Sequence, residues 1–158
     1  MPESNTAIRS YYLVSETLEN ALLNNNITKT VTIGDISEVD LGKQTIFPLA
    51  HFIVNNVTST EQTLVYSITV MAMDIVDTSK AETTDKFRGN NDHQDILNTQ
   101  LGVLNLLIQK LRFGDLHTTG YRVINDPVCE PFLDRFENNL AGWNADINIE
   151  VRNDQYIC

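Results

Sequence analysis

The sequence predicts an α+β domain: a largely antiparallel β-sheet with a long β-hairpin, packed against two amphipathic helices. From Trp143 to Arg152, apolar and polar residues alternate strictly, which indicates a strand with one buried face and one solvent-exposed face. Two other segments repeat their apolar residues at helical spacing, one near the N-terminus and one after residue 92. The predicted element order, α-β-β-β-α-β-β, places the helices together on one face of the sheet.

Length and composition indicate one globular domain spanning residues 1–158. The chain is long enough to bury an ordinary core without disulfide bonds or structural metal ions. Its 42% hydrophobic and 20% charged residues are typical of globular proteins. Within this domain we expect a flexible arm at 77–91 and a short mobile tail at 153–158. The net charge of −10 disfavours binding to nucleic acid or to an anionic membrane. It still permits a ring through which DNA slides.

The first helix is expected over residues 7–25. Its apolar residues recur at helical spacing, and Val14 and Ala21 broaden this apolar stripe. The helix is expected to end at Asn24, Asn25 and Asn26, because asparagine favours turns. The stripe consists of Ile8, Tyr11, Tyr12, Val14, Ser15, Leu18, Ala21 and Leu22.

Three strands are expected next, at residues 28–33, 45–54 and 62–76, and the last two form a hairpin around a polar turn at 55–61. The third strand exceeds the usual length of about five or six residues, and both of its faces carry apolar side chains. We therefore expect the hairpin to project past the core and to contact a neighbour. The polar, Thr-rich residues 77–91 are expected to form an arm that becomes ordered on assembly.

The second helix has the clearest signals. Asn91 and Gln94 have capping-box spacing, and Lys110, Arg112 and Gly114 mark the C-terminal end. Its broad apolar face is the natural cover for the sheet. After it we expect a loop at 115–120, a short strand at 121–124, a strand at 132–139, and a turn around 139–142 before the last strand.

The residues that could carry chemistry do not form a recognisable site, so we predict no catalytic, cofactor or metal site. His51, His93 and His117 are too scattered for a zinc site, and we interpret His51 as a hydrogen-bonded sheet histidine. Cys129 and Cys158 lack a metal-binding spacing and are expected to be free thiols. Phosphate-loop and nucleophile-elbow motifs are absent from the sequence.

Two alternatives to an assembly protein stay open on the residues alone. Asp74 and Asp77 could be metal ligands of a hydrolase, although a strand that ends in solvent explains them as well. Met71 and Met73 with Tyr66 could line the pocket of a small-ligand-binding module. The N-terminus has no charged-then-apolar leader pattern and no run of about 18 apolar residues exists, so neither secretion nor a membrane span is expected.

The closing segment, PFLDRFENNLAGWNADINIEV at 131–151, resembles the tail terminator or tail-completion proteins of tailed bacteriophages and related head-to-tail ring proteins. The order of elements extends this resemblance over most of the chain. It implies a non-enzymatic virion protein without cofactors, assembled in the host cytoplasm into a hexameric or twelvefold ring at the neck or tail. The ring would join portal or connector to tail, contact other virion rings, and let genomic DNA pass without binding it specifically.

The ring contacts are expected within Leu64–Ile75 and Asp77–Asn91, because a long hairpin and a polar arm exceed what a monomer's core needs. Asp134 and Arg135 face opposite sides of a strand, so one of them could pair across a subunit boundary. The candidate contact residues are Leu64, Tyr66, Met71, Met73, Ile75, Lys80, Phe87, Arg88, Asp134 and Arg135.

Overall fold

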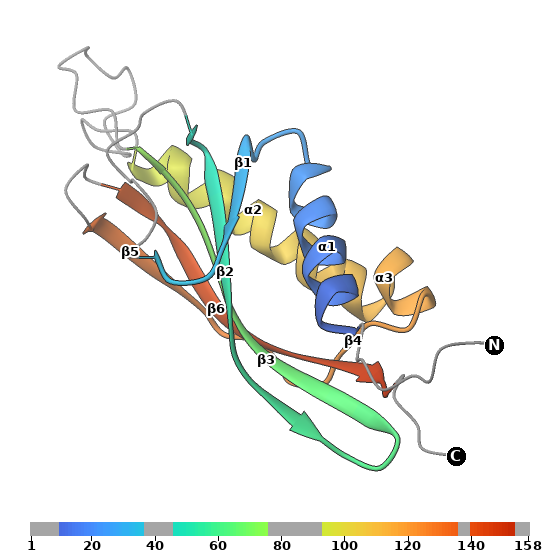
Figure 1. The fold of residues 1–158 in the computed structure, drawn as a ribbon. Coiled ribbons are helices and arrows are strands. Elements are labelled where there is room, and N and C mark those ends of the chain that lie inside the picture. Colours follow the sequence, from blue (N-terminus) through green and yellow to red (C-terminus); the bar gives the residue numbers. More distant parts are fainter. Residues whose placement is uncertain (1–9, 37–45, 76–92, 136–139, 154–158) are drawn as a thin grey trace, which may run out of the picture.

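A computed structural model describes residues 10–36, 46–75, 93–135 and 140–153 as a mixed α+β fold, with a layer of helices over one face of a twisted sheet (Figure 1). The predicted arm at 77–91 and the tail beyond Asn153 lie outside the described residues. In chain order the elements are α1 (Ser10–Leu23), β1 (Thr30–Ile33), β2 (Leu49–Ser59), β3 (Thr63–Ile75), α2 (His93–Arg112), α3 (Asp115–Thr118), β4 (Arg122–Val123), β5 (Cys129–Arg135) and β6 (Leu140–Arg152).

The sheet has six strands in the order β1-β2-β3-β6-β4, and β5 pairs with β6 beside that path. β1 is parallel to β2, and every other pairing is antiparallel, so the predicted, largely antiparallel sheet is confirmed. β4 and β5 lie one after the other along the same edge of β6. β5 covers Leu140–Ala145, and β4 covers Ile149 and Glu150.

The strict alternation in the last strand is also confirmed. Ala145, Ile147, Ile149 and Val151 of β6 face the main core and are buried, and Trp143 is half-buried against the same core, whereas Asp146 on the other face is exposed. The Trp143 indole N–H donates a hydrogen bond to the backbone carbonyl oxygen of Leu97 in α2, at 2.7 Å, which ties the helix to the strand. The main core lies between this face and the helices and includes Val14, Leu18, Leu22, Phe52, Leu64, Tyr66, Ile68, Val70, Val103, Leu104, Leu107, Leu111, Ala145, Ile147 and Ile149.

The buried stripe of α1 is narrower than the sequence predicted. Val14, Leu18 and Leu22 are buried, but Tyr11 and Tyr12 are 43% and 71% exposed. Tyr12 precedes Val14 by two positions, about 200° around a helix, so it points away from the sheet. The two tyrosine rings contact each other edge-on, with their centroids 6.1 Å apart.

The hairpin is longer than predicted, because residues 55–59 continue β2 and the turn comprises only Thr60–Gln62. The Thr60 N–H donates to the Thr63 carbonyl oxygen at 2.9 Å and closes this turn. The polar side chains of residues 55–59 misled the prediction, since they are exposed strand residues rather than turn residues. Beyond a register shift between Val54 and Asn56, the hairpin extends past the helix layer (Figure 1).

Both faces of β3 are apolar because each of them packs against a hydrophobic cluster. Leu64, Tyr66, Ile68, Val70 and Ala72 pack under the helices. On the opposite face a smaller cluster closes over one end of the strand, so apolar side chains on both faces of β3 do not by themselves indicate a neighbouring subunit. This second core consists of Phe47, Leu49, Met71, Met73, Phe132 and Leu140.

Three further predictions near the C-terminus were wrong in detail. Residues 115–118 form the short helix α3 rather than a loop, and β5 begins at Cys129, three residues before the predicted strand. Gly142 does not belong to a turn, because it lies inside β6 opposite Met73 of β3 and Phe132 of β5.

Gly142 lies where two strands approach too closely for any side chain. A Cβ atom at this position would overlap the carbonyl oxygen of Ala72 and come within 2.8 Å of the Cα atom of Met73. Both partners are backbone atoms of residues that are 0% exposed, so they cannot move aside as a flexible side chain could. The glycine is therefore required by the packing of β6 against β3.

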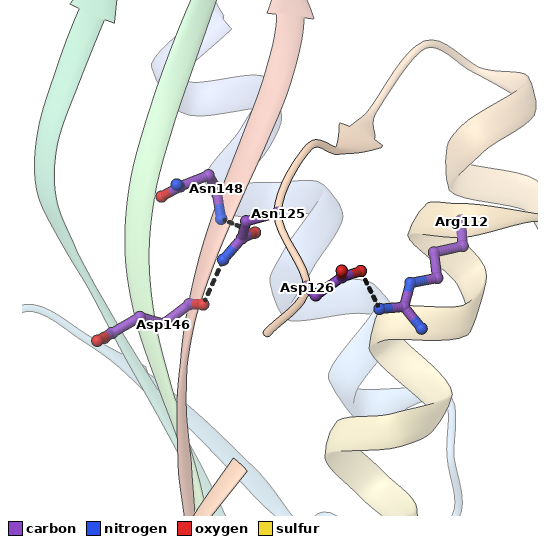
Figure 2. Close-up of polar contacts among 5 residues, drawn as sticks. All are labelled: Arg112, Asn125, Asp126, Asp146 and Asn148. Carbon is purple, nitrogen blue, oxygen red and sulfur yellow. Dashed lines mark hydrogen bonds and ion pairs between the residues drawn. The ribbon is translucent and has the colours of Figure 1, made fainter. Parts of the chain in front are cut away.

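Asn125 bridges the gap between β4 and β5 on the edge of β6 (Figure 2). Its side-chain amide donates to the carbonyl oxygen of Asp146 at 3.1 Å and accepts the N–H of Asn148 at 2.9 Å. The side chain thereby replaces the backbone groups that a continuous strand would supply. Next to it, Asp126 forms an ion pair with Arg112 at 3.3 Å, which contributes little because Asp126 is fully exposed.

We expect Gly142→Ala to lower the free energy of unfolding by more than about 2 kcal/mol, because the strands must separate to admit the methyl group. Chemical denaturation measures the loss. The matched control is Gly102→Ala in α2, where nothing lies within 4 Å of the added Cβ atom. This control should gain about 0.5 to 1 kcal/mol from helix propensity, and equal effects of the two substitutions would contradict the packing argument.

We expect Asn125→Ala to cost about 1 to 2 kcal/mol, because the Asp146 carbonyl and the Asn148 N–H both lose their partner. Hydrogen exchange should show faster exchange at the Asn148 amide in this variant. Asn105→Ala, at an exposed position of α2, is the control and should stay within about 0.5 kcal/mol of the wild type. Unchanged protection of Asn148 would contradict the bridging role.

Candidate functional site

His51 is buried in the sheet and holds β1 against β2. Its side chain is 2% exposed. Nε2 lies 2.6 Å from the carbonyl oxygen of Gly34, and Nδ1 lies 2.7 Å from the hydroxyl of Thr32. Because a carbonyl oxygen can only accept, Nε2 carries the proton and Nδ1 accepts the hydroxyl hydrogen. The prediction of a hydrogen-bonded sheet histidine is confirmed.

Burial lowers the pKa of His51 below its ordinary value of 6.5, while the hydrogen bond to Gly34 and the charge of Asp35 act in the opposite direction. The lowered pKa favours the neutral imidazole, in which Nδ1 accepts the hydroxyl hydrogen of Thr32. Both ring nitrogens are occupied by protein groups, so His51 has neither a free lone pair for a metal nor a position for a substrate. Its role in the described structure is to join two strands.

Of the two carboxylates considered as metal ligands, only Asp74 lies among the described residues. Asp74 is half-buried near the end of β3, and one of its oxygens accepts the N–H of Ile75 at 2.8 Å. Asp77 lies outside the described residues, and His117 is exposed on α3. Within the parts of the chain that the structure describes, no group of three or more His, Cys, Asp or Glu residues could hold a metal ion.

The pair of methionines proposed as a pocket wall is separated from its proposed partner. Met71 and Met73 lie in the smaller core, whereas Tyr66 lies on the other face of β3 in the main core. A recess between α1, α2 and β6, lined by Val14 and Ile149 among others, is too small for a water molecule. This recess therefore has no room for a ligand.

Cys129 is half-buried in β5 and packs against the main core. Burial raises the pKa of its thiol above the ordinary value, so less of the reactive thiolate is present at neutral pH. No disulfide involves Cys129, as predicted. Cys158 lies outside the described residues.

The structure changes the set of candidate contact residues. Leu64, Tyr66 and Met73 are 4%, 1% and 0% exposed, so their side chains stabilise the subunit itself and we withdraw them as contacts. Met71, in the smaller core, is withdrawn for the same reason, and Ile75 packs against the same cluster. The sequence signal was misleading because a two-sided core and an interface produce the same apolar pattern on a strand.

The remaining candidates keep their status as predictions. Asp134 and Arg135 lie in β5, but their side chains fall outside the described parts. Lys80, Phe87 and Arg88 belong to residues 76–92, which the structure does not describe.

The face of the sheet away from the helices carries polar groups that sequence reasoning did not connect. The Asn55 amide donates to the Thr69 hydroxyl at 2.7 Å, and that hydroxyl donates to the Asp146 carboxylate at 2.6 Å. This chain of hydrogen bonds crosses β2, β3 and β6 on the exposed side. The residue types were visible in the sequence, but only the strand register brings them together.

Charge is distributed unevenly across the sheet. β1, β2, and β3 as far as Met73 contain no Asp, Glu, Lys or Arg. The other side carries Arg122, Glu130, Asp134, Arg135, Asp146, Glu150 and Arg152. One edge of the sheet is therefore uncharged and the other is charged. The described residues on these strands do not form a reactive cluster.

We expect the stability of the protein to fall as the pH is lowered from about 7 to about 5.5, partly because of His51. Its pKa is lower in the folded state than in the unfolded state, so its contribution is fully present above about 6.5. Below that value the unfolded state binds the proton more readily and the contribution is lost. Thermal unfolding across this range should show a smaller drop for His51→Gln, which cannot titrate, and identical slopes would contradict this role.

Comparison with known proteins leaves the chain without an assigned family. None of the helices in the described segments is long and apolar enough to cross a membrane. No protein-family model matches the chain, and the comparison with curated proteins found no match.

Proposed function

We propose that this chain is a structural virion protein of a tailed bacteriophage, a ring-forming subunit at the head-tail interface or the tail end. In this role it joins portal or connector to tail and lets the genome pass. The observation that carries the proposal is the β2–β3 hairpin, which extends beyond the helix layer with residues 55–60 exposed (Figure 1). Residues 55–60 lie outside the hydrophobic core, although Leu64 and Tyr66, which pair with this part of β2, belong to it. We therefore assign the exposed residues 55–60 to contacts with other copies or other rings.

The element order supports the same proposal. The described order is the α-β-β-β-α-β-β order on which the resemblance to tail terminator and tail-completion proteins rests, with a short helix and a short strand added before the closing pair. The hairpin and the closing strand are also the longest strands in the sheet. Fold alone does not determine function, so the proposal rests on the exposed hairpin residues as well as on the order of elements.

Charge is consistent with a channel for DNA. Each subunit has a net charge of −10, and exposed carboxylates such as Glu130 and Asp146 lie on strands of the open side of the sheet. Several copies around a lumen would repel a polyanion, so DNA would slide through without binding specifically. The same charge disfavours contact with an anionic membrane.

A closed ring requires two different surfaces on each subunit. Residues 77–91, with Lys80, Phe87 and Arg88, together with Asp134 and Arg135, remain our candidate contacts for a hexamer or a dodecamer. We assign no catalytic role to the chain and no cofactor. Neither a ligand-binding module nor a hydrolase is favoured by a specific feature of the described residues.

The test is negative-stain imaging with light scattering, on the purified protein alone and mixed with portal complexes or tails. We expect closed rings of six or twelve copies, either free or on the partner. A protein that stays monomeric and never joins portal or tail complexes would overturn the proposal.

A triple variant tests the proposed contacts in the same experiment. Replacing Lys80, Phe87 and Arg88 by alanine should reduce the fraction of protein in rings by about tenfold or more, as loss of contact residues does in other interfaces. The matched control replaces Gln94, Asn98 and Asn105, three exposed residues of α2, and should leave ring formation unchanged.

A further inference from the structure

Among the described residues, no strand pairs with the outer edge of β2 along its second half. β1 pairs with β2 only as far as Phe52, and from Ile53 to Ser59 the only described partner strand is β3. Residues 55–59 are exposed. Backbone N–H and C=O groups along such an edge are able to pair with a further strand.

The hydrogen-bond pattern shows which residues present these groups. Thr60 and Thr63 form a hydrogen-bonded pair at the turn. Hydrogen-bonded and non-hydrogen-bonded pairs alternate along an antiparallel ladder, so Ser59 and Val57 occupy the non-hydrogen-bonded positions opposite Leu64 and Tyr66. The N–H and C=O groups of Val57 and Ser59 therefore point away from β3, toward the open edge.

This edge lacks the side chains that usually prevent strand pairing. Natural edges are guarded by charges, especially lysine, and by proline. From Ile53 to Thr60 there is neither a charged residue nor a proline. The register shift between Val54 and Asn56 lies within this stretch but before Val57, so from Val57 to Thr60 the edge carries none of these guards. The opposite edge of the sheet is guarded, because β5 contains Pro131 and Glu130.

We propose that two copies of this chain pair through this edge, with their β2 strands antiparallel about a two-fold axis at Thr58. In this register Val57 of each copy lies opposite Ser59 of the other, and each pair exchanges two backbone hydrogen bonds. Thr58 lies opposite Thr58, and Asn56 lies opposite Thr60, both favourable polar pairs. The Val57 side chain, 43% exposed in one copy, becomes covered.

Electrostatics favours a second copy at this edge over contact elsewhere. Two subunits of charge −10 repel each other, and an edge whose strands carry no charged residue up to Met73 lets them approach with the least repulsion. The β5 edge of another copy is a poor partner for β2, because it carries a proline and charged residues. The β2 edge of another copy is therefore the better partner. The two-fold contact is distinct from the cyclic contact that closes a ring, so it goes beyond the proposed function.

Disulfide trapping tests the register. In a Cys129→Ala, Cys158→Ala background, Thr58→Cys would place two thiols at a non-hydrogen-bonded pair, with Cα atoms about 4.5 Å apart, within disulfide range. We expect mild oxidation to yield a covalent dimer joined at residue 58. Asn56→Cys, two residues away on the same exposed strand, faces Thr60 rather than itself and should give at least about fivefold less dimer. Equal trapping at both positions, or none at 58, would overturn the proposal.

Sedimentation of the protein without introduced cysteines gives an independent test. We expect reversible dimerisation that strengthens as salt is added, because salt screens the repulsion between the acidic subunits. Thr58→Lys places like charges opposite each other and should weaken the dimer about tenfold or more without changing the thermal unfolding midpoint. Rings that form without trapping at residue 58 would refute this inference alone, whereas trapped dimers that never join portal or tail complexes would refute only the ring.

Discussion

The structure depends on the pairing of β3 with β6, which runs without interruption from Thr63 opposite Arg152 to Ile75 opposite Leu140. These two strands are the longest pair in the sheet, and α2 packs against both of them. Because side chains alternate across a strand, one register fixes two things at once. Val70 and Ala145 are placed under the helices, while Thr69 and Asp146 are placed on the open face.

The close approach of these strands restricts what the neighbouring positions can be. Gly142 has no room for a side chain, and small residues such as Ala50, Ala72, Ala141 and Ala145 are fully buried in the same sheet. Small side chains let a helix and two strands approach closely, so that their atoms make more dispersion contacts with one another. At the outer edge of β6, Asn125 preserves backbone hydrogen bonding where the strand is interrupted.

The two edges of the sheet differ in a way that bears on assembly. The β5 edge carries charges and a proline, whereas the second half of β2 carries neither. An unguarded edge on an acidic subunit is a surface where copies can meet with little electrostatic repulsion. In this interpretation, contacts between copies come from backbone groups and polar side chains, and the large apolar side chains of β3 serve the subunit's own core.

Sequence alone determined the fold class, the order of the main elements and the buried face of β6, because alternation and helical spacing are local patterns that follow from backbone geometry. It also identified His51 as a hydrogen-bonded residue. Only the tertiary structure showed that Met71 and Met73 belong to a second core. It also showed that Gly142 lies inside β6, where that strand approaches β3, rather than in a turn, and that Asn125 forms hydrogen bonds along the edge of β6 between β4 and β5. Each of these findings depends on which segments, distant in the chain, become neighbours. The strand register sets those neighbours, and it cannot be derived from the sequence of either segment alone.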